Sequence, residues 1–272
     1  MKRLFTFGCS HTQWSYPTWA DFLATGYNHF ENWGLKGAGN RAIVERLSEC
    51  LMQNQLTSDD TVVIQWTDFH RFDIHNPTKE WRTSWNCNGS LLHSEDSLNF
   101  IKHHWFEGSY IYHTFNFVHF AINMLNNLPC KWVMFSRNDL TRDIDRFQQL
   151  QLYKPLFNDP HWISPMRDYL ERTNFQGTTL NLYKVKRNMW GDEVKSFVNK
   201  IDDHPTPEVH AAWLKECLLP RLGVTIDESF IDKVNKQYNK VKFEEMEEDE
   251  LFNFVEWNDA GWHQFSNTVH GL

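Results

Sequence analysis

Four short blocks of the chain combine the residue types that acyl transfer requires. They are Gly8-Cys9-Ser10-His11-Thr12, residues 34–40, Gln65-Trp66-Thr67-Asp68 and Ile201-Asp202-Asp203-His204-Pro205. Together they supply a serine hydroxyl, a glycine-rich backbone and an Asp/His pair. Acyl transfer uses a nucleophile, a base that takes its proton, a carboxylate that orients the base, and donors that bind the oxyanion. Because ligands of parallel α/β sheets bind beyond the carboxyl ends of the strands, we expect the first three blocks on one rim.

The order of these blocks resembles that of the SGNH (GDSL-type) hydrolases, in the divergent branch found in phages and bacterial surface-glycan clusters. The family's G-x-S motif is matched by Gly8-Cys9-Ser10, its N-x-x-x-x-G block by residues 32–37, and its D-x-H-P block by residues 202–205. The resemblance covers about residues 1–220. It implies a three-layer α/β/α sandwich with a mainly parallel, flavodoxin-like sheet, and a serine esterase that needs no cofactor.

The resemblance also implies a role for each site residue. Ser10 is the nucleophile, His204 is the base and Asp202 is the carboxylate that orients the base. Asp203 competes for the orienting role, and we prefer Asp202 because adjacent residues on a turn usually point apart. The backbone amides of Ser10 and Gly37 are expected to bind the oxyanion.

The third block departs from the family pattern. The family usually has G-x-N-D, whereas this chain has Thr67 at the position of the asparagine. A threonine hydroxyl can donate, and Asn40 is a second candidate donor. Losing one oxyanion donor costs about 3–4 kcal/mol of transition-state stabilisation, so the departure bears directly on activity.

Each of these residues also has a structural interpretation. Ser10 after a strand could cap a helix, and the segment from His204 could simply begin one. Gly37 and its neighbouring glycines could serve turn geometry alone, and Asn40 could be a cap or turn residue.

The high aromatic content bears on the substrate. The chain has 13 Trp, 21 Phe and 8 Tyr. Three tryptophans fall in a weakly periodic stretch at about residues 69–110, which is long enough to be a functional loop or lid. Flat ring faces commonly bind sugars, so the predicted substrate is an acylated carbohydrate or another small ester. The candidate substrate-binding residues are Trp66, Arg71, Trp81, Trp85 and Trp105, with Arg71 either structural or facing an anionic substrate.

Three functions therefore remain open. The first is a serine esterase that removes an O-acyl group, such as acetyl, from a carbohydrate. The second uses the same triad for O-acyl transfer onto a sugar. The third is a non-catalytic virion, assembly or glycan-binding module on a degenerate hydrolase fold.

The composition excludes other classes. A formal net charge of −8 argues against a broad nucleic-acid surface. No apolar run approaches the ~20 residues needed to cross a bilayer, and the N-terminal run is too short for a signal peptide. These features favour a cytoplasmic protein, with virion association as an alternative. Five widely spaced cysteines suggest free thiols, and His103-His104 have no carboxylate partner, so we expect no metal site.

The elements that must position the blocks alternate between strand and helix. Short apolar runs predict strands at about 4–7, 30–33, 61–66 and 130–136, and helical spacing predicts helices near 17–24, 41–51, 112–128, 140–153, 166–173, 207–219 and 226–238. We divide the chain into an α/β domain at 1–222, with an irregular insertion at 69–110, and a helical and acidic extension at 223–272. The extension carries an acidic segment at 244–250 and aromatic residues that could contact a second copy of the chain or a virion.

Overall fold

The computed structural model describes residues 1–14, 16–75, 85–90, 106–142, 144, 147–187, 193–202, 204–240 and 267–268. Within these ranges the side chains of residues 72, 74–75, 85–90, 179–187, 193–202 and 267–268 are not described.

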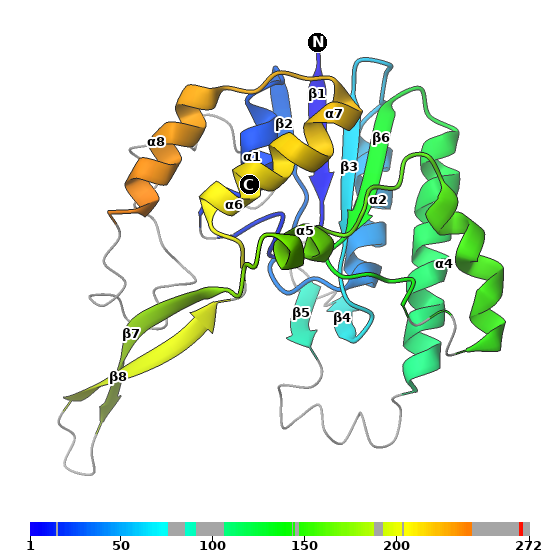
Figure 1. Ribbon diagram of the computed structural model, residues 1–272. Coiled ribbons are helices and arrows are strands. Elements are labelled where there is room, and N and C mark those ends of the chain that lie inside the picture. The colour runs from blue at the N-terminus through cyan, green and yellow to red at the C-terminus, as the bar shows by residue number, and fades with distance from the viewer. Residues whose placement is uncertain are drawn as a thin grey trace.

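A parallel β-sheet forms the centre of the structure (Figure 1). Its strands are β1 (Arg3–Phe7), β2 (His29–Asn32), β3 (Thr61–Trp66), β6 (Lys131–Ser136) and the two-residue β9 (Asn267–Thr268). They lie in the order β6-β3-β1-β2-β9, and every neighbouring pair is parallel. The central strands are buried apolar runs rich in β-branched and aromatic residues, which suits strands covered on both faces. The order of β2, β1, β3 and β6 is that of a flavodoxin-like sheet, as predicted.

Helices cover both faces of this sheet, so the domain has three layers. Phe5, Val62 and Ile64 point to one face, where they pack with α2 (Asn40–Gln53) and α4 (Glu107–Asn126). Leu4 and Val63 alternate with them and point to the other face. The elements that pack there are α1 (Trp19–Ala24), α5 (Met166–Arg172), α6 (Pro207–Trp213), the π-helical η5 (Leu214–Leu218), α7 (Leu219–Leu222) and α8 (Glu228–Tyr238).

Two antiparallel ribbons lie outside the central sheet. One pairs β4 (Arg71–His75) with β5 (Trp85–Ser90), and the other pairs β7 (Thr178–Arg187) with β8 (Glu193–Asp202). The second ribbon extends away from the helices and sheet in Figure 1. The first corrects the prediction that residues 69–110 are irregular, since that region contains β4, β5 and the start of α4. The helix predicted near 140–153 is also misplaced, because the chain forms a 3₁₀ helix, η4, at Gln148–Asn158.

The helical part of the predicted extension packs on the α/β domain. Phe230, Ile231 and Val234 of α8 belong to the same buried cluster as Phe22 of α1 and Trp213 of α6. Most of the acidic and aromatic remainder, including residues 244–250, lies outside the described residues, so its proposed contacts stay predictions.

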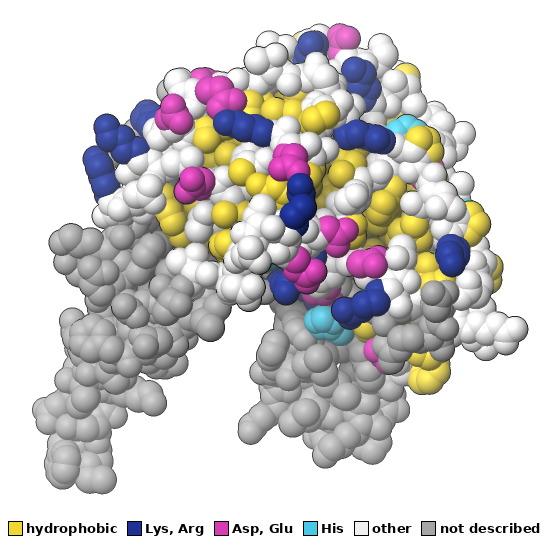
Figure 2. Space-filling view, viewed as in Figure 1, with side chains coloured by type: hydrophobic (Ala, Val, Ile, Leu, Met, Phe, Trp, Pro, Cys, Tyr) yellow, Lys and Arg dark blue, Asp and Glu magenta, His cyan; other side chains and the backbone are white. Residues whose placement is uncertain are grey.

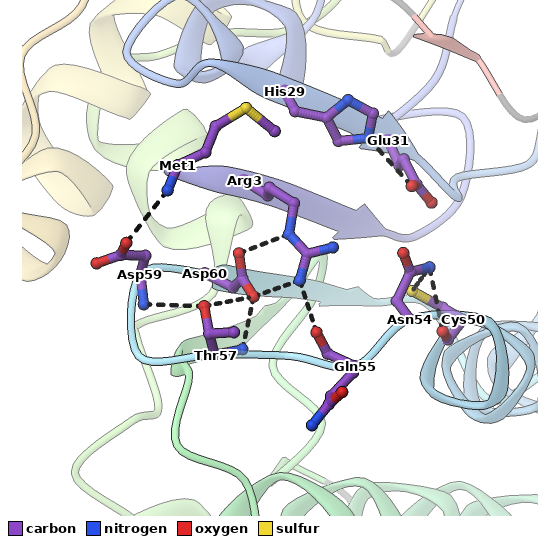
Figure 3. Close-up of polar contacts among 10 residues, drawn as sticks. All are labelled: Met1, Arg3, His29, Glu31, Cys50, Asn54, Gln55, Thr57, Asp59 and Asp60. Atoms are coloured by element: carbon purple, nitrogen blue, oxygen red, sulfur yellow. Dashed lines mark hydrogen bonds and ion pairs between the residues drawn. The ribbon is translucent and has the colours of Figure 1, made fainter.

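A polar network closes the edge of the sheet where the strands begin (Figure 3). Arg3 donates from Nε and Nη2 to the two carboxylate oxygens of Asp60, at 2.8 and 2.6 Å. Asp60 also accepts from the backbone N–H and the hydroxyl of Thr57, at 2.6 and 3.1 Å. This network ties β1 to the start of β3 at the edge opposite the predicted site.

Lys, Arg, Asp and Glu side chains are interspersed over the described part of the face seen in Figure 2. In the described part of the chain, no helix has the length and apolarity needed to cross a bilayer. Cys9, Cys50 and Cys130 are buried free thiols, and Cys217 is a partly exposed one.

Candidate active site

Ser10 lies directly beyond the carboxyl end of β1, at the point where the strand order reverses. The chain continues from β1 to β2 on one side and from β3 to β6 on the other, and ligands of open α/β sheets bind at such a switch point. A turn in which the Thr12 N–H donates to the Cys9 carbonyl, at 2.9 Å, holds Ser10. Ser10 does not cap the following helix, because Thr18 caps α1 and accepts from the Ala20 N–H.

His204 lies far from Ser10 in the sequence but contacts it in the structure. Its Nε2 lies 2.7 Å from the Ser10 Oγ, although 194 positions separate the two residues. That distance is within the reach expected of a nucleophile and its general base. His204 does not itself begin the next helix, because Thr206 caps α6 and Pro207 occupies its first turn.

An indole ring holds the His204 imidazole from one side. The rings of Trp14 and His204 stack with centroids 3.7 Å apart and an angle of 14° between their planes. The Lys36 ammonium also lies by the Trp14 ring, 5.2 Å from its centroid. Because a stacked neighbour restricts rotation of the imidazole, Trp14 keeps the Nε2 atom directed at Ser10.

The orienting carboxylate falls at the limit of the described residues. Asp202 is the last residue of β8, and its backbone pairs with Thr178 of β7. Its side chain and the whole of Asp203 lie outside the described residues. The choice between these two aspartates therefore stays a prediction.

The second block folds against the first. The Leu35 N–H donates to the Gly8 carbonyl at 3.0 Å, and the Asn32 side chain donates to the Thr12 carbonyl at 3.0 Å. Residues 35–38 form a turn in which the Ala38 N–H donates to the Leu35 carbonyl. Gly37 has a φ of 77° in this turn. A positive φ at this turn position favours glycine, so Gly37 has a conformational role whatever its amide binds.

Asn40 is not available as an oxyanion donor. Its side-chain N–H₂ donates to the Thr67 carbonyl at 2.9 Å and to the Thr114 hydroxyl at 3.2 Å, and its Oδ1 accepts from the Thr67 N–H at 2.8 Å. Both amide hydrogens are thus engaged, and the prediction that Asn40 binds the oxyanion is wrong. Its role is to fix the backbone of the third block.

Thr67 retains an unengaged hydroxyl. The residue is fully buried, and its Oγ1 has no hydrogen-bond partner among the residues that the structure describes. A buried hydroxyl without a partner is costly unless something else bonds to it. Thr67 therefore remains the side-chain candidate for the third oxyanion donor.

Two other side chains of the third block, those of Trp66 and Gln65, are structural. Trp66 is fully buried in the core, and its indole N–H points to the Met134 sulfur at 3.4 Å. Its ring cannot be offered to a substrate, so the prediction that Trp66 binds substrate is wrong. The neighbouring Gln65 accepts from the Thr12 hydroxyl at 2.5 Å and so supports the turn that carries Ser10.

Of the remaining substrate-binding candidates, only Arg71 has a side chain that the structure describes. Trp81 and Trp105 lie outside the described residues, and Trp85 begins β5 with its side chain undescribed. Arg71 begins β4, and its Nη1 donates to the Ala38 carbonyl at 3.1 Å. Arg71 therefore lies beside the Gly37 turn.

Two acidic residues near the site make contacts that sequence reasoning did not predict. Asp73 of β4 accepts from the Gly39 and Ala42 N–H groups at 2.7 and 3.0 Å, and so caps α2 in place of a local side chain. Asp68 accepts from the Asn138 side chain and lies 3.5 Å from the Arg137 guanidinium. No sequence signal marks these contacts, because their partners are distant in the chain.

Two further histidines, His11 and His210, surround His204 and were also missed as a group. The rings of His11 and His204 have centroids 4.9 Å apart, and those of His11 and His210 are 6.5 Å apart. Both are buried, and their ring nitrogens have no partner in the described ranges. Burial, together with the charge of His204, lowers the pKa of His210 to about 3. Burial and the charge of Arg137 lower the pKa of His11 well below its ordinary value.

We expect the free energy of unfolding to fall as the pH decreases from about 6.5 toward 3. Below pH 6.5 the unfolded chain protonates these histidines, whereas the native state keeps them neutral because their folded pKa values are lowered. Each contributes a slope of up to about 1.4 kcal/mol per pH unit. Urea titrations at pH 7 and pH 5 measure this slope, and His210→Gln should reduce it. The exposed His119→Gln is the control, and an unchanged slope in His210→Gln contradicts the prediction.

Comparisons with known proteins add no family assignment. A scan against protein-family models and a search of curated proteins both found no match. Among the described residues, no group of three or more His, Cys, Asp or Glu side chains is arranged to hold a metal ion. The site is thus defined by its geometry: a Ser–His pair at the switch point of a flavodoxin-like sheet.

Proposed function

We propose that the protein is a serine esterase of the SGNH type that hydrolyses an O-acyl ester, such as an O-acetyl ester, on a carbohydrate. The observation that supports this most strongly is the 2.7 Å contact between the Ser10 Oγ and the His204 Nε2. Neither residue is explained by a capping role, and both lie where α/β sheets bind ligands. A structural module has no need of a base within reach of a buried serine at this position.

The proposed reaction has two steps. In the first, His204 takes the hydroxyl proton as the Ser10 Oγ attacks the ester carbonyl. The ester C–O bond then breaks, the imidazolium gives that proton to the departing sugar oxygen, and the acyl group stays on Ser10 as an acyl-enzyme. In the second, His204 takes a proton from water, the hydroxide attacks the acyl-enzyme, and the proton returns to Ser10 as the carboxylic acid leaves. Asp202 is proposed to hold the imidazole in the tautomer with Nε2 free to accept.

The oxyanion of each tetrahedral intermediate needs donors already in place. The backbone amides of Ser10 and Gly37 are the proposed pair, since the Gly37 turn is tied to the end of β1. The Thr67 hydroxyl, which has no hydrogen-bond partner among the described residues, is the proposed third donor. A preorganised donor of this kind is typically worth about 3–4 kcal/mol in the transition state.

Active-site labelling tests the proposal directly. The full chain is incubated with a fluorophosphonate, the modified residue is located by mass spectrometry, and hydrolysis of 4-nitrophenyl acetate is followed in parallel. We expect the label on Ser10 and loss of both label and hydrolysis in Ser10→Ala. Ser58→Ala is the matched control, because Ser58 is exposed and lies before β3, at the opposite edge of the sheet. If Ser10 is not labelled and the two variants hydrolyse the ester equally, the serine esterase proposal is refuted.

The two adjacent aspartates can be separated by the same assay. We expect Asp202→Asn to lower kcat about 10³-fold or more, because the imidazole loses the partner that fixes its tautomer. Asp203→Asn should stay within a few-fold of the unmodified chain. The reverse result, with activity kept in Asp202→Asn and lost in Asp203→Asn, moves the role to Asp203.

A further inference from the structure

A cavity adjoins the candidate active site on the α2 and α4 side of the sheet. Its volume is about 450 Å³, which is within the usual range for a small-molecule site. The walls come from the start of α2, from β4 with the residues just before it, and from the first half of α4. Neither Ser10 nor His204 lines it, so it is distinct from the catalytic pair.

The cavity shares two walls with the proposed oxyanion site. Asn40, at the start of α2, lines the cavity and bonds to the backbone of Thr67 on its other side. Arg71 lines the cavity and donates to the Ala38 carbonyl, one residue after Gly37. A molecule seated in the cavity would therefore lie against the same two segments that border the proposed oxyanion site.

Arg71 is the positively charged side chain of this cavity that still has N–H donors available for a ligand. One guanidinium nitrogen bonds to the Ala38 carbonyl, and in the described part of the chain no carboxylate pairs with the residue. Arg41, the other arginine of the wall, is already paired with Glu45 at 2.8 Å. A guanidinium presents several N–H donors in a plane, and a carboxylate accepts two of them at once.

Asp73, the acidic residue of the wall, does not neutralise the positive charge that Arg71 offers to a ligand. Asp73 is buried, and its two oxygens accept from the Gly39 and Ala42 N–H groups at the start of α2. Its negative charge is thus directed at the positive end of the α2 dipole. The charge of Arg71 is also one of the groups that lower the pKa of His11, whose ring lies beside that of His204.

The rest of the wall suits a ring that carries hydroxyl groups. Phe69, Tyr110 and Phe117 supply aromatic surface, and Ser109 supplies a hydroxyl. Burial raises the pKa of Tyr110, which keeps its phenol protonated and able to donate. Aromatic faces with a few polar groups and the Arg71 guanidinium fit a sugar ring with an anionic substituent better than a neutral lipid chain.

We propose that this cavity binds a carboxylate-bearing sugar of an acidic glycan through Arg71, beside the ester held at Ser10. The inference rests on the proposed function and narrows its substrate to acylated glycans that contain uronic-acid-type residues. The acyl group is then cleaved next to, or on, the charged sugar, and the arginine selects the acidic glycan over a neutral one.

Binding without catalysis tests the cavity separately from the reaction. In a Ser10→Ala background, calorimetry with an unacylated uronic acid disaccharide should show binding that a neutral disaccharide does not match. Adding Arg71→Gln should weaken that binding at least tenfold, and Arg71→Lys should weaken it less because the charge remains. Arg167→Gln, on the exposed face of α5, is the matched arginine control. Equal binding of the acidic and neutral sugars, or no loss in Arg71→Gln, overturns the inference.

A second measurement uses the active chain. The ratio of kcat/KM for an acetylated acidic sugar to that for its neutral counterpart should fall at least tenfold in Arg71→Gln. An unchanged ratio contradicts the inference, and tighter binding of a sulfated sugar than of the uronic acid overturns the choice of a carboxylate. If Ser10→Ala still hydrolyses 4-nitrophenyl acetate, the esterase proposal fails on its own, whatever the calorimetry shows.

Discussion

Ser10→Ala, His204→Gln and the double variant are expected to lose nearly the same activity, each about 10⁵–10⁶-fold in kcat. The base acts only by taking the Ser10 proton, so removing either member of the pair removes the whole pathway. The 2.7 Å contact between the Ser10 Oγ and the His204 Nε2 is the physical basis of this coupling. Steady-state hydrolysis of 4-nitrophenyl acetate by the three variants measures it.

The double variant makes this test specific. If the two residues acted independently, their losses in kcat would multiply, whereas a coupled pair loses no more in the double variant than in either single one. Ser58→Ala and the exposed His119→Gln control for nonspecific damage. A double variant whose loss is the product of the two single losses contradicts the assignment of the pair.

Among the proposed substitutions, Asp60→Asn is expected to lower the free energy of unfolding most, by about 3–5 kcal/mol. Asp60 is fully buried, and the change leaves the Arg3 guanidinium without its counter-charge. The N–H and hydroxyl of Thr57 lose a charged acceptor at the same time. Urea denaturation at pH 7 measures the difference. Asp59→Asn is the matched control, because its 62% exposed side chain makes only a surface ion pair with the N-terminus.

The Asp60 carboxylate also makes the free energy of unfolding depend on pH. Burial alone would raise the pKa of Asp60, but the hydrogen bonds from Arg3 and Thr57 hold it below its ordinary value. Its contribution is therefore complete above the unfolded pKa, near 3.8, and is lost as the pH falls through the lower folded pKa. The difference between the unmodified chain and Asp60→Asn should shrink below pH 4. A difference that stays constant down to pH 3 contradicts this account.

Four strands of the central sheet, β1, β2, β3 and β6, could be predicted because each is a local signal, whereas the two-residue β9 was not predicted. The run Thr61–Trp66 was predicted with the bounds that the structure has, since its apolar and β-branched residues are buried on both faces. The ribbon β7–β8 was not predicted. Its strands mix apolar residues with lysine and asparagine, and their pairing is decided by contacts between strands.

For the site, the order of the sequence blocks predicted the Ser10–His204 contact, whereas residue type alone gave a wrong role for Asn40. Ser10 and His204 were predicted to meet, and they do. Asn40 was misassigned because its type suits an oxyanion donor, while its engagement with Thr67 and Thr114 depends on the packing of α2 against α4. Asp73 was missed for a related reason, since a cap supplied from a distant strand leaves no pattern near the start of the helix.

The distance along the chain between Ser10 and His204 has a consequence for the order of folding. The contact between Thr12 and Gln65 closes 53 residues, whereas the Ser10–His204 contact closes 194. The longer closure costs only about 1 kcal/mol more in chain entropy, but contacts of such high sequence separation form slowly. Nascent or refolding chains should therefore pair β1, β2, β3 and β6 before the nucleophile meets its base. Hydrolysis would be among the last native properties to return, which makes it a reporter of completed folding.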